Sequence, residues 1–231
     1  MDSAFESRVS RGAVAPKEFP PGLRFAFWAC VVIAVAVVVR RVVALISPAT
    51  GGPPQMARLD AVFAGRAALT LAHILPAAAF VLLSPFVLSW KFGGRQRMLL
   101  AFYALGVWTG ATAYAMSRYA VGGWLERSAV LVFNSLFLWE LGQSYFLWRR
   151  GEVAEGRRWL IRAIAVLLGI ATTRPVMGVF FATSPLTHLQ PSQFFGMAFW
   201  IGFTINTVVI ESWLRLQRSD PSSPDRLTLA R

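Results

Sequence analysis

Acidic residues, cysteine and histidine are all scarce in this chain of 231 residues, which has 11 Asp and Glu, two His and one Cys. A single cysteine, Cys30, excludes an intramolecular disulfide, so cysteine usage does not indicate a redox compartment. Two histidines are too few for two bis-histidine haems. The sequence contains no Walker, Gly-x-Ser-x-Gly or His-Glu-x-x-His motif and no cysteine cluster, so it predicts neither a catalytic residue nor a metal site.

Charged residues are scarce as well, and the chain contains several long apolar stretches. Charged residues make up 15% of the chain and hydrophobic residues 56%, whereas a soluble domain is about 25% charged. A membrane span needs about 20 mostly apolar residues. We therefore predict an all-α polytopic membrane protein, a bundle of about six transmembrane helices within residues 23–214. The predicted spans are 25–47, 67–90, 98–117, 128–148, 159–182 and 194–214.

The positive charges alternate between the connecting segments. They concentrate in 1–24, 91–97, 149–158 and 215–231, and the other loops hold few. The positive-inside rule then places both termini in the cytoplasm. Residues 1–22 form a predicted flexible arm, and 215–231 a predicted disordered tail. The net charge of +12 reflects this topology and attraction to anionic lipid at the cytoplasmic face, rather than nucleic-acid binding.

Polar side chains from several spans reach one depth in the outer half of the predicted bundle. Inserting an ionisable side chain into hydrocarbon costs about 2.5–3.5 kcal/mol of free energy, so such a residue is expected to be paired or functional. Arg174 precedes Pro175, which leaves the carbonyl of Ala171 free. Such a place suits an anion, a polar headgroup or a quinone carbonyl, although a snorkelling arginine and a histidine satisfied by a neighbouring helix remain alternatives. The candidate ligand-binding residues are His73, Tyr114, Asn134 and Arg174.

A second polar group lies toward the predicted cytoplasmic side. Glu211 and Arg215 have the i, i+4 spacing of a surface ion pair. Glu140 lies deeper and needs either a cation such as Arg162 or a proton, so a structural role and a proton relay both stay open. We therefore expect an inner polar network of Glu140, Arg162 and Glu211.

Two further patterns concern the helices themselves. Arg40 and Arg41 interrupt the first apolar stretch, and we expect the helix to continue through Ser47 with both guanidinium groups snorkelling outward. Gly106 and Gly110 form a Gly-x-x-x-Gly pattern, which predicts a close contact between helices of this chain. Prolines inside two spans predict kinks that free backbone carbonyls: Pro76, Pro85 and Pro175.

Three segments carry a resemblance to a known family. Leu-Ala-His-Ile at 71–74 supplies a histidine in an early span. Residues 96–103 resemble a His-Arg-x-x-Gly-Arg-x-Tyr pattern, with Gln for His and Leu-Ala for Gly-Arg, and 156–162 resemble His-Arg-x-Trp-Met-x-Arg, with Gly for His and Leu for Met. With Arg174 and Glu211, residues 66–215 resemble the bacterial multi-pass membrane family called domain of unknown function twenty-three-oh-six. The resemblance implies this architecture in a bacterial inner membrane and directs attention to His73, Arg162 and Arg174, but it implies no activity.

The leading interpretation is an integral membrane protein with a polar site for a small molecule, lipid headgroup or quinone in the outer half of the bundle. One alternative is a redox protein linked to haem or quinone, in which a single haem would lie between His73 and His188 or use a methionine ligand. Another is a transporter of a small solute, or one coupled to protons. The sequence leaves both alternatives open and does not identify a substrate.

Overall fold

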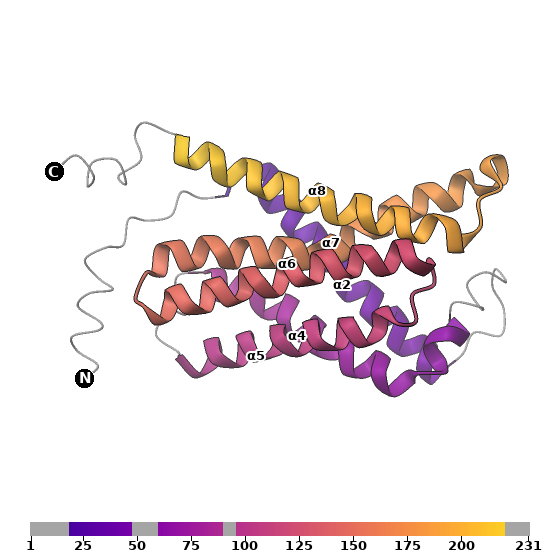
Figure 1. The fold of residues 1–231 in the computed structure, drawn as a ribbon, viewed down its shortest axis with the longest axis horizontal. Coiled ribbons are helices and arrows are strands. Elements are labelled where there is room, and N and C mark those ends of the chain that lie inside the picture. The colour runs from indigo at the N-terminus through magenta and orange to yellow at the C-terminus, as the bar shows by residue number, and fades with distance from the viewer. Residues whose placement is uncertain (1–18, 48–59, 90–95, 220–231) are drawn as a thin grey trace.

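The described part of the chain is helical, as the sequence predicts. The computed structural model describes residues 19–47, 60–89 and 96–219, which form six long helices and a short helical segment at 60–64. Figure 1 shows them as a bundle of roughly antiparallel helices. The long helices are α2 (Pro21–Ile46), α4 (Ala67–Leu88), α5 (Gln96–Ser117), α6 (Gly123–Arg149), α7 (Val153–Thr187) and α8 (Pro191–Ser219).

The helices have the length and composition of membrane spans. Five are long and apolar enough to cross a bilayer: α2, α4, α5, α7 and residues Pro191–Gln217 of α8. Helix α6 is not among the five, although its 27 residues give it sufficient length. It carries Asn134 and Glu140 in its middle and packs against α5, α7 and α8. The chain is therefore a multi-pass membrane protein.

The helix boundaries extend several of the predicted spans. Helix α2 continues past both arginines to Ile46, as predicted. Helix α7 ends at Thr187 and α8 at Ser219, beyond the predicted 182 and 214. The α8 extension includes Arg215, whose side chain bonds back to Glu211 one turn earlier. Helix α2 includes residues 21 and 22 of the predicted arm, and α8 includes residues 215–219 of the predicted disordered tail. Residues 1–18 and 220–231 lie outside the described residues, so the rest of the arm and of the tail stays a prediction.

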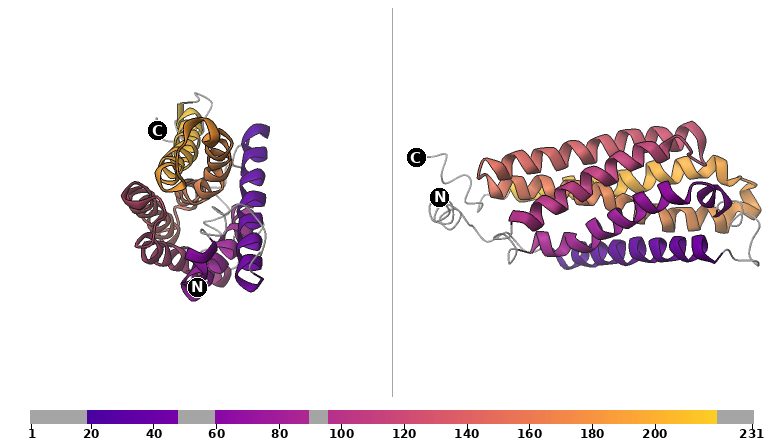
Figure 2. Two further views of the ribbon diagram at one scale, coloured as in Figure 1. Left: turned by 90° about the vertical axis from the view of Figure 1, so that its right-hand side faces the viewer. Right: turned by 90° about the horizontal axis from the view of Figure 1, so that it is seen from below.

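Helix α7 is the central element of the bundle. At 35 residues it is the longest of the six helices, and it packs against α2, α4, α6 and α8. Helix α2 is peripheral, at the edge of the bundle in the left view of Figure 2. Val31 is its buried residue, whereas Phe25 and Ile46 are 77% and 79% exposed. Such side chains suit a surface that faces lipid, where exposed apolar groups carry no hydration cost.

The first and last long helices meet at one end of the bundle. The Phe19 ring, just before α2, stacks on Trp213 of α8 with 4.8 Å between centroids. Leu23 packs in the same cluster, against buried Leu214. We call this the inner end, where α2 begins and α8 ends, and the opposite one the outer end, where α2 ends and α4 begins. The charge pattern predicts that the inner end faces the cytoplasm.

The Gly-x-x-x-Gly pattern of α5 is filled by this chain's own helices. A Cβ at Gly106 would lie 2.5 Å from Leu141 of α6 and 2.9 Å from Phe80 of α4. One at Gly110 would lie 2.5 Å from Leu138 of α6. The predicted internal contact is confirmed, because these glycines let α5 approach its neighbours closely.

A proline in α4 creates a hydrogen-bond acceptor that a neighbouring helix uses. Both α4 and α7 continue through their internal prolines. Pro76 has no N–H to offer the carbonyl of Ala72 four residues earlier. The indole Nε1–H of Trp108 on α5 donates to that oxygen at 2.8 Å. The freed acceptor is thus satisfied by a tertiary contact between α4 and α5.

A close backbone approach between α7 and α8 predicts that one glycine is needed for stability. A Cβ at Gly202 of α8 would lie 2.7 Å from the backbone nitrogen of Thr173 on α7, which cannot move aside. We expect Gly202→Ala to lower the free energy of unfolding by about 1–3 kcal/mol. The matched control is Gly142→Ala on α6, where a Cβ meets nothing within 4 Å. It should leave stability unchanged or raise it by up to about 1 kcal/mol, from helix propensity. Thermal unfolding in detergent measures both, and equal melting temperatures would contradict this packing.

Candidate functional site

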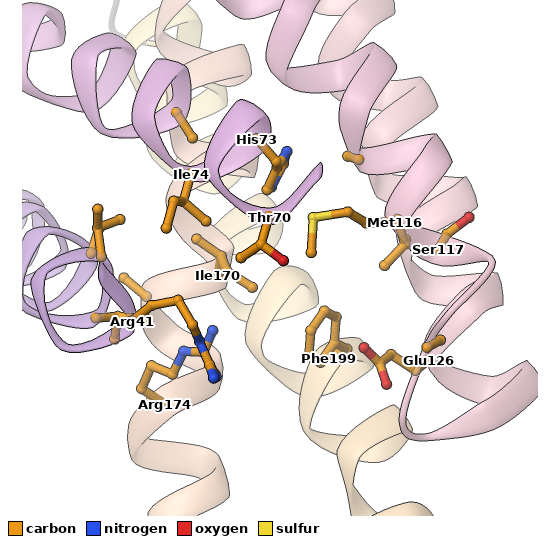
Figure 3. A pocket seen from close by; sticks show the side chains of 18 of the residues that line it. Arg41, Thr70, His73, Ile74, Met116, Ser117, Glu126, Ile170, Arg174 and Phe199 are labelled. Atoms are coloured by element: carbon orange, nitrogen blue, oxygen red, sulfur yellow. The ribbon is translucent and has the colours of Figure 1, made fainter. Parts of the chain in front are cut away.

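The outer half of the bundle encloses a cavity of about 510 Å³. All six long helices contribute to its wall, and Figure 3 shows the side chains that point into it. This volume is within the range of about 300–1,000 Å³ that is typical of sites for small molecules. Its size and its position between helices make it the candidate functional site.

The inner part of the cavity is apolar. Phe133, Phe137, Val166 and Phe203 line it, and on α6 Phe137 is the last lining residue toward the inner end. Phe80 packs edge-on to Phe137, with 5.7 Å between ring centroids. A layer of buried aromatic rings therefore bounds the cavity toward the inner end.

The outer part of the cavity is polar and opens at the outer end. Five lining residues there are exposed: Arg40, Val62, Arg66, Tyr119 and Gly178. The guanidinium of Arg66 lies over the ring of Tyr119, 3.7 Å from the centroid. This contact joins the start of α4 to the turn after α5 and forms part of the rim.

Three of the four predicted ligand-binding residues line this cavity. They are His73, Asn134 and Arg174, from α4, α6 and α7. Nδ1 of His73 lies 3.0 Å from the Thr112 hydroxyl of α5. The Asn134 amide donates to the carbonyl of Gly110 at 3.0 Å. The histidine and the asparagine thus each have a partner on a neighbouring helix, and the structure brings both to the same space as Arg174.

Tyr114, the fourth predicted residue, does not line the cavity. Its hydroxyl lies 2.7 Å from that of Ser135 on α6, in an exposed contact. Ala113, the preceding residue, does line the cavity. Successive residues of a helix point about 100° apart, so depth alone does not place both on one face.

Arg174 has hydrogen-bond donors left over. Its Nε is buried and has no hydrogen-bond partner among the described residues. Its Nη1 makes a long contact of 3.8 Å to the sulfur of Met177, which is a weak acceptor. Figure 3 shows the guanidinium beside that of Arg41, pointing into the cavity. The charges that act on Arg174 are those of Arg41, Glu126 and Arg40.

Arg40 and Arg41 share one carboxylate instead of only snorkelling. Arg41 Nη1 lies 2.6 Å from Asp60 Oδ1, and Arg40 Nη2 lies 3.1 Å from Oδ2. The Arg41 guanidinium also lies over the Phe63 ring, 3.9 Å from its centroid. Asp60 was not identified from the sequence. Its isolation in the sequence could have indicated it as a partner, because Asp60 is the only acidic residue between Glu18 and Glu126.

Glu126 is the one acidic residue of the cavity wall among the described residues, and it was not identified from the sequence either. It lies in the first turn of α6, where its Oε2 accepts the backbone N–H of Gly122 at 2.6 Å. The carboxylate is therefore held at the start of its own helix, on the side of the cavity away from the arginine pair (Figure 3). Against it stand four lining arginines, so the wall carries an excess of positive charge: Arg40, Arg41, Arg66 and Arg174.

The inner polar network differs from the expected pairing. Arg162 Nε lies 2.8 Å from Glu211, which also accepts from Arg215 at 2.9 Å. The predicted surface pair with Arg215 is confirmed, but Glu211 is shared between two arginines. Arg162 does not hydrogen-bond to Glu140, whose buried Oε2 has no partner among the described residues. The network lies on α6, α7 and α8 and does not line the cavity.

The histidines do not face one another across a common space. His188 is the C-cap of α7, in a left-handed conformation with φ of 55°, and it does not line the cavity that His73 lines. Among the described residues, no cluster of three His, Cys, Asp or Glu suits a metal ion. The geometry thus gives no support to a haem between these two histidines.

No protein-family model, curated protein or solved structure that was compared with the chain matches it. The family resemblance described from the sequence therefore stays a prediction. The function has to be argued from the cavity itself.

The inner network predicts opposite effects for two neutralising substitutions. Glu140→Gln should leave the free energy of unfolding unchanged or raised, because Oε2 of this buried carboxyl has no hydrogen bond to lose. Arg162→Gln should lower it by roughly 1–3 kcal/mol, between the values for exposed and fully buried ion pairs. Thermal unfolding of the purified variants in one detergent checks the ranking. A larger loss for Glu140→Gln than for Arg162→Gln would contradict it.

Proposed function

We propose that this multi-pass membrane protein binds an amphiphilic small molecule in the cavity between its helices. The observation that carries the proposal is the division of the cavity wall into an apolar inner part and a cationic outer part. An amphiphile needs both environments in one space, and a water-soluble solute has no use for the apolar part. Lipids and quinones both belong to this class.

The position of the opening supports uptake from the outer side of the bilayer. The exposed lining residues are at the outer end, and the aromatic layer beside Phe137 bounds the opposite side. The polar end of the ligand would then lie near Arg41 and Arg174, with its apolar part directed toward Phe133 and Phe137. The host membrane that we propose, from the family resemblance and the basic segments, is a bacterial inner membrane with anionic lipid at its cytoplasmic face.

Coupled transport is a second candidate, favoured by one observation. Glu140 lies one helical turn beyond Phe137 on α6, and its buried Oε2 has no partner among the described residues. A carboxyl in that position can carry a proton on the inner side of the aromatic layer. In proteoliposomes with a pH-sensitive dye, Glu140→Gln would then abolish proton flux while the protein stays folded. Equal flux in the wild type and the variant would remove this candidate.

Filling the cavity tests the binding proposal. Ala113→Phe places a ring in the wall of the cavity, whereas Ala111→Phe on the same helix adds the same ring to an exposed position outside it. We expect Ala113→Phe to lose most of the amphiphile that remains bound after detergent washing, and Ala111→Phe to retain it. Mass spectrometry of the extract, normalised to protein, measures the bound amount.

Melting temperatures of the two variants show whether each remains folded. Equal retention by both would contradict binding in the cavity. So would an absence of bound amphiphile in the wild type, both as purified and after incubation with bilayer lipid.

A further inference from the structure

We propose that the polar end of the bound amphiphile is a phosphate group and that Arg41 and Arg174 hold it. This inference rests on the proposed binding function and specifies the class of ligand. It starts from an arrangement that is unfavourable without a ligand, namely two guanidinium groups side by side in one cavity wall.

The two arginines come from different helices and converge. Arg41 projects from the outer part of α2, and Arg174 from α7, next to Pro175. In the view of Figure 3 the two guanidinium groups come together in the cavity, and the charge of Arg41 acts on Arg174. Like charges at close range repel, and the repulsion is strong where water is excluded. An anion between them would convert this repulsion into two charge-assisted hydrogen-bonded contacts.

Asp60 and Glu126, the described carboxylates near this site, do not complete it. Asp60 bonds to Arg41 and Arg40, and no contact of Asp60 with Arg174 is among its hydrogen bonds. Glu126 is engaged by the backbone of Gly122. Arg174 therefore keeps a buried Nε without a partner among the described residues. The donor capacity that remains is directed into the cavity, where the polar end of an amphiphile would lie.

The number and kind of donors favour phosphate. A guanidinium group presents donors in a planar fork that matches two oxygens of a phosphate or a carboxylate. Two guanidinium groups from separate helices, with the charge of Arg40 nearby, carry more positive charge than the single negative charge of one carboxylate balances. A phosphate offers more oxygens and up to two negative charges. The same chemistry could come from a phospholipid headgroup or from free phosphate, and the test separates these sources.

The test uses three probes on the delipidated full-length protein. These are phosphatidic acid, diacylglycerol with the same acyl chains, and inorganic phosphate, each titrated by native mass spectrometry. The variants are Arg41→Gln, Arg174→Gln and the conservative Arg174→Lys. The control is Arg127→Gln, which removes a positive charge at the same end of the bundle from a residue that does not line the cavity.

Binding of the phospholipid should depend on the two arginines. We expect phosphatidic acid to bind about tenfold to a hundredfold more weakly to Arg41→Gln and Arg174→Gln, as for the loss of a hydrogen bond between charged groups. Arg174→Lys should retain part of the affinity, and Arg127→Gln nearly all of it. Diacylglycerol should bind the wild type and all variants equally weakly. Binding of inorganic phosphate with the same arginine dependence would support the phosphate site and identify the free ion as its source.

A second readout separates ligand binding from a structural role. Without lipid, Arg174→Gln should melt at a higher temperature than the wild type, because it removes a repelling charge and an unsatisfied donor. Phosphatidic acid should then stabilise the wild type more than the variant. A structural arginine would give the reverse, a variant that is less stable under both conditions.

The outcomes also distinguish this inference from the proposed function. If diacylglycerol and phosphatidic acid bind equally and neither depends on Arg174, the cavity binds amphiphiles but the phosphate site is wrong. If no probe binds, and Ala113→Phe changes nothing, both proposals fail.

Discussion

The cost of placing arginine in a membrane, in a chain with few acidic residues, governs the polar architecture of this bundle. The sequence has 23 basic and 11 acidic residues, so the cations that enter the helices cannot each have their own carboxylate. At the outer end Asp60 forms ion pairs with both Arg40 and Arg41. At the inner end Glu211 forms ion pairs with both Arg162 and Arg215. Sharing lowers the cost of desolvation for each pair of cations, and Arg174 is left without such a bond among the described residues.

Helix α7 contributes an arginine to the polar residues at each end of the bundle. It carries Arg162 near the inner end and Arg174 in the cavity wall, and twelve residues of helix separate them by about 18 Å. The helix can hold charges in both places because it packs against α2, α4, α6 and α8, and none of its residues from 155 to 174 is exposed. A helix at the edge of the bundle, such as α2, has arginines only near its ends. Arg24 lies at the inner end, and Arg40 and Arg41 lie near the outer end, where Asp60 and the rim are within reach.

Features that depend on how deep a residue lies in the membrane could be predicted from the sequence. Features that depend on the rotation of a helix about its own axis could not. Apolar length predicts the six helices, since a span must exceed the thickness of the hydrocarbon. The rise per residue placed His73, Asn134 and Arg174 at matching depth, and all three line one cavity. Tyr114 has a similar depth but turns toward Ser135, because helix packing fixes the rotation. Asp60 lies in a connecting segment, where no periodicity indicates its partner. The sharing of Glu211 depends on how α7 and α8 meet, which spacing within α8 cannot show.

The polar residues of this cavity differ in whether their hydrogen-bonding groups are already paired within the protein. His73 and Asn134 each bond to α5, so each also helps to fix neighbouring helices, and its presence does not require a ligand. Arg174 fixes no neighbour through a strong bond, and it faces a second cation. A glutamine there would give up little bonding within the protein and would remove the repulsion. The arginine is therefore explained by something that the folded chain alone does not contain, and its excess donors and charge specify an anion.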